Sequence, residues 1–136
     1  MGTWSVAAFG NDDAADWAYA LEDADDLEPI EKAISAVIAV GEEYLEAPEA
    51  TEAVAAIEVL ACLLGKPGET ETYTEAVDQW LQRVDLKPEP ELVDRAHLAL
   101  TKILAEDSEL HELWRDSEDY EQWLAVMADL RSRVGA

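Results

Sequence analysis

The stretch from Trp4 to Leu21 reads Trp-Ser-Val-Ala-Ala-Phe-Gly-Asn-Asp-Asp-Ala-Ala-Asp-Trp-Ala-Tyr-Ala-Leu, and it joins a short apolar arm to the start of a helix. Asn11 is a favourable N-cap, because its side-chain oxygen can accept a hydrogen bond from a free backbone N–H one turn later. Apolar residues then recur at the i, i+3, i+4 and i+7 spacing of one helix face: Ala14, Trp17, Ala18 and Leu21. The stretch therefore predicts an amphipathic first helix that begins at Asn11.

The arm before this helix carries an aromatic residue near each end, Trp4 and Phe9. Aromatic side chains of this size contribute strongly to a core when they leave water. We expect both rings to be pinned into the core, with the arm extended across neighbouring helices. Trp4, Phe9, Asn11 and Trp17 then form a structural motif. A ligand-binding pair is the alternative for Trp4 and Trp17, because both flank the acidic end of the chain.

The same residues resemble the opening signature of a bacterial family catalogued as domain of unknown function 4259. Its members begin with a Trp-Gly-x-Gly-x-Phe-x-Asn-Asp-x-Ala-x-Asp pattern, and this chain has Ser5 and Ala7 where Gly is usual. Residues 112–124, Glu-Leu-Trp-Arg-Asp-Ser-Glu-Asp-Tyr-Glu-Gln-Trp-Leu, resemble the ending of the same family. The resemblance implies a small helical bacterial protein, and it brings no agreed activity and no catalytic residues.

Helical spacing of apolar residues continues along the rest of the chain, interrupted by Gly, Pro and polar turns. We expect a helix from Glu28-Pro29 to the segment before Pro48, with Gly41 inside it at a close helix crossing. Further helices are expected over 49–64, from Thr72 or Thr74 to residue 85, and over 90–105, 108–115 and 117–134. No segment shows convincing strand alternation apart from the arm.

The sequence therefore predicts an all-α fold: a compact bundle of six or seven helices in a single domain over residues 1–136, with residues 1–10 as an extended arm packed on it. Ser108 and Ser117 are expected to cap the last two helices, because serine is a preferred N-cap. The polar spacing Thr72-x-x-Glu75 is that of a capping box at the fourth helix.

The formal net charge of the chain is −23, from 32 acidic and nine basic residues. Nucleic acid and anionic membranes are disfavoured as partners, because few basic side chains are available to neutralise rows of phosphates. Residues 1–31 contain nine acids and no Lys or Arg. The molecule is therefore expected to have an acidic end.

The candidate catalytic and metal-binding patterns in the sequence are incomplete. Asp94-x-x-His97 and Asp107-x-x-x-His111 fall short of the paired Glu-x-x-His motifs of a dimetal bundle, so both histidines are expected at the surface or half-buried. The acidic run from Asp23 lacks the Gly and the Glu of a calcium loop. Cys62 lies in an apolar run and is expected to be a buried, inert thiol. We predict no metal and no cofactor.

These observations favour a non-enzymatic interaction protein that binds a basic protein partner, in the manner of an immunity protein or a nucleic-acid mimic. The alternative is a small carboxylate- or metal-dependent hydrolase. The partner-binding residues are expected in and after the first helix: Asp12, Asp13, Asp16, Asp23, Asp25 and Asp26. Solubility or salt adaptation would also account for the acidity. Because no signal segment or long apolar run is evident, we expect a cytoplasmic protein, with a monomer favoured.

The acidic turn after the first helix leads to a specific expectation. Carboxylates at a helix C-terminus oppose the dipole, and no basic residue precedes Lys32 to pair with them locally. We expect the combined Asn substitution of Asp23, Asp25 and Asp26 to leave stability unchanged or higher at low salt.

Overall fold

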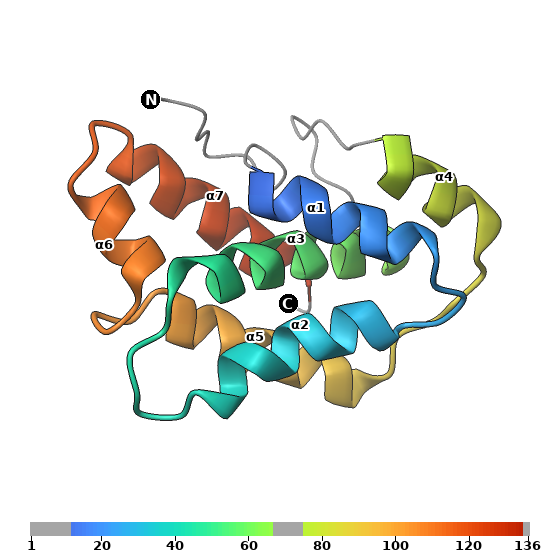
Figure 1. The fold of residues 1–136 in the computed structure, drawn as a ribbon, viewed down its shortest axis with the longest axis horizontal. Coiled ribbons are helices and arrows are strands. Elements are labelled where there is room, and N and C mark those ends of the chain that lie inside the picture. Colours follow the sequence, from blue (N-terminus) through green and yellow to red (C-terminus); the bar gives the residue numbers. More distant parts are fainter. Residues whose placement is uncertain (1–11, 67–74, 135–136) are drawn as a thin grey trace.

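The computed structural model of the chain describes residues 12–66 and 75–134, and they fold into a bundle of seven helices (Figure 1). The helices are α1 (Asp12–Glu22), α2 (Glu28–Ala39), α3 (Ala47–Leu63), α4 (Glu75–Arg83), α5 (Pro90–Ile103), α6 (Glu109–Arg115) and α7 (Tyr120–Arg133). The described residues contain no strand, and their only β contact is an isolated bridge between Leu45 and Ser108. The predicted all-α class is confirmed.

Helix α3 is the centre of the fold, because it contacts every other helix. In Figure 1, α1 and α4 lie above it and α2 and α5 below it, while α6 and α7 lie at the left. All residues from Ala53 to Ala61 are buried, so the helix is surrounded on every side over more than two turns. Alanines at many of these positions allow its neighbours to approach closely. The last three residues of the expected 49–64 helix, by contrast, are only partly buried.

Proline and glycine mark several helix boundaries, as expected for Pro29, Pro90 and Gly65, whereas Pro48 was expected to end the second helix. Pro29, Pro48 and Pro90 each occupy the first turn of their helix, where the missing N–H removes no intrahelical hydrogen bond. Gly65 has a φ of +82° just after α3, the left-handed conformation that ends many helices. Ser108 caps α6 as predicted, since its hydroxyl accepts a hydrogen bond from the backbone N–H of His111.

Three expectations about helix ends and burial were wrong. Gly41 does not lie inside α2: the helix ends at Ala39, and Gly41 turns the chain with a φ of +62°. A Cβ built on Gly41 would meet nothing within 4 Å, so no helix crosses there. Ser117 does not cap α7, whose N-cap is Asp119. Cys62 is half-buried rather than buried, because it lies in the last turn of α3, past the surrounded stretch.

The loop between α2 and α3 is joined to the loop between α5 and α6. Leu45 donates its backbone N–H to the carbonyl of Asp107 at 2.9 Å and accepts from the N–H of Glu109 at 2.8 Å. The Glu109 carboxylate in turn accepts from the N–H of Ala47 at the start of α3. Lys102 donates to the Glu43 carbonyl and to the Asp107 carboxylate, which lowers the pKa of Asp107. This junction orients the N-terminus of α3.

Part of the predicted arm motif lies outside the described residues. Trp4, Phe9 and Asn11 precede them, and so does the arm over residues 1–10. The proposed capping box at Thr72 falls in the undescribed 67–74 segment. Of the four motif residues, Trp17 is the one that the structure describes.

Candidate partner-binding surface

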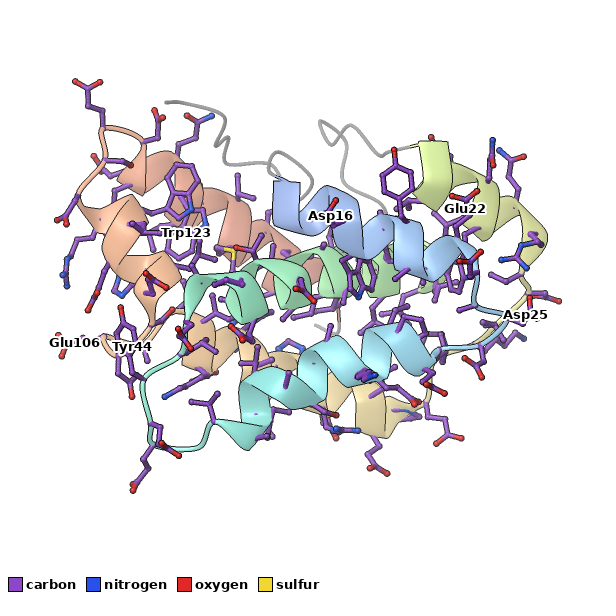
Figure 2. All side chains as sticks on the ribbon, in the orientation of Figure 1. Asp16, Glu22, Asp25, Tyr44, Glu106 and Trp123 are labelled. Atoms are coloured by element: carbon purple, nitrogen blue, oxygen red, sulfur yellow. The ribbon has the colours of Figure 1, made fainter. Side chains whose placement is uncertain are left out.

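Helix α1 and the turn directly after it carry two exposed residues of the predicted partner-binding set. Asp16 lies within α1, and Asp23 is the first residue after its end; both are exposed. Asp12 and Asp13 lie in the first turn of α1, and their side chains are outside the described set. Figure 2 shows Asp16, Glu22 and Asp25 following one another along α1 and into the next turn. We call Asp16 of α1 and Asp23 directly after it the α1 acidic face.

The C-terminal end of α1 is held by two side chains of α4. Arg83 donates to the carbonyl oxygens of Glu22 and Ala24 at 2.7 and 2.8 Å, and it also forms a 2.6 Å ion pair with Asp25. The indole N–H of Trp80 donates to the same Ala24 carbonyl at 2.9 Å. Carbonyls at a helix C-terminus lack intrahelical partners, and cationic donors there complement the dipole. Arg83 thus offsets the unfavourable position of the acids after α1.

Asp26 has a structural contact of its own at the next helix. Its carboxylate accepts a 3.0 Å hydrogen bond from the backbone N–H of Glu28, the first residue of α2. The N-cap residue Leu27 has no side-chain acceptor. The Asp26 carboxylate, one residue earlier, provides the hydrogen-bond acceptor that an N-cap side chain usually provides. The negative charge also lies near the positive end of the α2 dipole.

The six predicted partner-binding residues therefore fall into different structural roles. Asp25 and Asp26 hold bonds within the protein, which the sequence expectation of a locally unpaired turn did not include. Asp16 and Asp23 are exposed and form no ion pair with any described residue. The ion-pair partner of Asp25 is Arg83, which lies 58 positions later in the chain.

Most of the few basic side chains bond groups within the protein. Arg83, Lys102 and Arg133 each contact a carboxylate and at least one backbone carbonyl. Arg95 donates to Ser35, and Arg131 donates to Thr101. These basic side chains therefore bond to groups within the protein, whereas most carboxylates of the described residues are exposed to solvent.

Glu58 is a buried ionic residue that sequence reasoning missed. It is 1% exposed within α3, and its two carboxylate oxygens accept from the Arg133 guanidinium at 2.6 and 2.7 Å. The pair raises the pKa of Arg133 above its usual value, with the hydrogen bonds to Glu58 as the main cause. The only sequence signal was a single acid within the apolar run of α3, because burying an unpaired carboxylate is very unfavourable.

His111 belongs to an aromatic cluster, and it is buried rather than exposed or half-buried as the sequence suggested. Its Nδ1 lies 3.0 Å from the Ala105 carbonyl and its Nε2 lies 2.7 Å from the Tyr120 hydroxyl. A carbonyl can only accept, so Nδ1 carries the proton, and in the neutral ring Nε2 accepts from Tyr120. Trp123 stacks on His111 and on Trp114. Nδ1 therefore joins α6 to the loop after α5, and Nε2 joins α6 to Tyr120 at the start of α7. Trp123 of this cluster is labelled in Figure 2.

His97 is half-buried on α5, as expected, and its Nε2 has no hydrogen-bond partner among the described residues. Within residues 12–66 and 75–134, no three His, Cys, Asp or Glu side chains are grouped to hold a metal ion. Asp107, the proposed companion of His111, is paired with Lys102 instead. The hydrolase alternative gains no support from these residues.

Trp17 is 7% exposed, and its remaining exposed edge lines a shallow groove between α1 and α2. The ring is thus mainly a core residue that packs among α1, α2 and α3. No helix among the described residues is both long and apolar enough to cross a bilayer.

The structure defines an acidic, all-helical protein whose basic side chains mostly bond within the fold. The chain belongs to the family described as Domain of unknown function (DUF4259), whose family model matches residues 2–126. The resemblance seen in the sequence is confirmed. No curated protein and no solved structure matches the chain.

Proposed function

We propose that this protein is a non-enzymatic interaction module that binds a basic protein partner through the α1 acidic face. Asp16 on α1 and Asp23 directly after it supply exposed carboxylates. Charges of one sign on a surface attract an oppositely charged partner and speed its encounter. Immunity proteins and nucleic-acid mimics are the classes that this chemistry fits.

The observation that supports the proposal most directly is that basic side chains form ion pairs and hydrogen bonds within the protein. Three of the nine, Arg83, Lys102 and Arg133, form ion pairs within the protein and also bond backbone carbonyls. They offset few of the exposed carboxylates, so the outward field is strongly negative. On α1 itself no described residue is basic.

The proposal is tested by measuring how fast an oligoarginine peptide associates with the whole chain. The test variant is Asp16→Asn/Asp23→Asn. The matched control is Glu106→Gln/Glu118→Gln, which changes the charge equally at exposed positions; Figure 2 shows Glu106 at the end of the molecule opposite Asp25. Each measurement is repeated at low and high NaCl, because exposed charges interact over about 10 Å at 0.1 M salt.

We expect the α1 variant to associate several-fold more slowly than wild type at low salt, with the control much closer to wild type. The difference should shrink at high salt. An equal loss in both variants would mean that the peptide responds to overall charge alone, and would overturn the proposal in favour of an ordinary solvated surface.

A further inference from the structure

A groove of about 420 Å³ runs between α1 and α2, with α3 contributing at one side. Its apolar lining comes from Trp17 and Ala20 on α1 and from Pro29, Ala33 and Ala36 on α2. Pockets that take small ligands measure about 300–1,000 Å³. The groove is therefore large enough for one or two side chains and too small to receive a whole helix.

The short side chains of the lining leave the edge of the indole accessible. Trp17 is mostly buried, so its ring is fixed in position before anything binds. A rigid aromatic surface in a depression is a favourable place for an apolar anchor, since little conformational freedom is lost there.

Carboxylates surround this apolar floor. Glu28 and Glu52 line the groove, with Lys32 as its one basic lining residue. Asp16 lies one turn before Ala20 on α1, so helix geometry places it beside the groove, and Asp23 directly follows the end of α1. An occupant therefore meets an apolar centre with a mainly negative rim.

We propose that this groove is the anchor site for the basic partner: it receives one apolar side chain of a partner segment, whose flanking Lys or Arg residues pair with the acidic rim. The inference rests on the proposed function, and it adds the place of contact and the composition of the partner segment. Charge complementarity selects a basic segment, and the apolar lining of the groove selects an apolar side chain within it.

Two labelled peptides test the composition: Lys-Lys-Leu-Lys-Lys and Lys-Lys-Ser-Lys-Lys, which differ only in the central residue. Fluorescence anisotropy with the whole chain gives a Kd for each. Burial of a leucine side chain predicts about tenfold tighter binding of the leucine peptide. Equal Kd values for the two peptides would overturn the anchor site.

Two alanine variants test the place of contact. Ala36→Gln fills the groove without changing charge, and Ala39→Gln is its control at an exposed position of the same helix that does not line the groove. Ala36→Gln should remove the preference for leucine, and Ala39→Gln should keep it. Preference retained in both variants would place the leucine elsewhere and overturn the inference.

A diazirine analogue of leucine in the same peptide should cross-link to residues of the groove, which mass spectrometry maps on the chain. Sedimentation of the protein alone tests a second copy as the occupant. A dimer that Ala36→Gln dissociates would assign the groove to self-association and overturn the proposal.

Failure of this inference and failure of the proposed function give different results. If both peptides bind equally and Asp16→Asn/Asp23→Asn weakens both, the acidic face binds basic partners and the groove is not the anchor. If Asp16→Asn/Asp23→Asn has no effect on either peptide, the proposed function fails as well.

Discussion

The carboxylate of Glu58 on α3 and the guanidinium of Arg133 on α7 form a two-bond ion pair, at 2.6 and 2.7 Å, in a nearly buried position. The residues are 75 positions apart in the chain. The pair connects the central helix to the last turn of the last helix. The Asp129 carboxylate and the Lys66 carbonyl also accept hydrogen bonds from Arg133.

Removal of one partner from this pair should be strongly destabilising. Glu58→Ala leaves Arg133 with a reduced set of acceptors and should lower the free energy of unfolding by about 3–5 kcal/mol. Asp129→Asn is the control: its side chain is 63% exposed, and exposed ion pairs contribute about 0–1 kcal/mol. Urea denaturation measures both. Similar small losses in the two variants would show that the buried pair contributes little.

The three acids after α1 should respond differently to neutral substitution. Asp26→Asn weakens the acceptor at the start of α2, and an Asp26→Ala change, which removes it, should cost about 1 kcal/mol. Asp25→Asn loses a surface ion pair worth less than about 1 kcal/mol. Asp23→Asn should leave stability equal or higher. This replaces the sequence-based expectation for the triple variant, which should now be slightly less stable than wild type. A triple variant more stable than wild type would contradict the structural roles of Asp25 and Asp26.

Stability should rise with NaCl concentration, because the net charge of −23 produces repulsion between exposed carboxylates. Screening shortens that repulsion to about 10 Å at 0.1 M salt. Thermal melts in NaCl should show an increasing Tm, and the slope should be smaller in Glu106→Gln/Glu118→Gln. A Tm that falls with salt would mean that the internal ion pairs dominate the surface repulsion.

Trp17→Ala should cost about 3–5 kcal/mol, as expected for truncation of a large buried aromatic residue. The ring is 7% exposed and belongs to the core, so the change leaves a cavity between α1, α2 and α3. Tyr19→Ala is the comparison on the same helix, since Tyr19 is 66% exposed and should change stability by less than about 0.5 kcal/mol. Chemical denaturation distinguishes the two, and an unchanged midpoint for Trp17→Ala would contradict its burial.

Tyr44 should titrate at unusually high pH. Its hydroxyl donates to the Glu112 carboxylate at 2.7 Å, and this bond is the main cause that raises the pKa of Tyr44 to about 12. The folded pKa lies above the unfolded value of about 10, so the stability from this contact is complete below about pH 10. It is lost as the pH rises through about 12.

The difference in phenolate absorbance between wild type and Tyr44→Phe isolates this residue from the other tyrosines. In a Glu112→Gln background, Tyr44 measured in the same way should titrate closer to pH 10, because the negatively charged hydrogen-bond acceptor is gone. An identical titration in both backgrounds would show that the hydrogen bond does not hold the proton.

Local signals in the sequence were sufficient for most of the fold. The apolar period of α1, the prolines at the starts of α2, α3 and α5, and the Ser108 cap act within one or two helical turns. Each therefore works on the chain before any tertiary contact forms. The wrong prediction at Gly41 concerns a position where two local signals compete. At Gly41 the left-handed turn prevailed over the apolar period, which continues past it in the sequence.

For the candidate site, the sequence by itself determined which residues are acidic and that nine acids precede the first basic residue, Lys32. Only the tertiary structure decided which acids are paired. The partners of Asp25 and Glu58 lie 58 and 75 positions away, and their identity depends on how α4 meets α1 and how α7 meets α3. The groove beside Trp17 likewise requires α1 and α2 to lie side by side on α3. Both the ion pairs that join two helices and the groove between two helices depend on the distances between those helices. A pattern along the sequence does not contain these distances, because short loops leave several packing arrangements open.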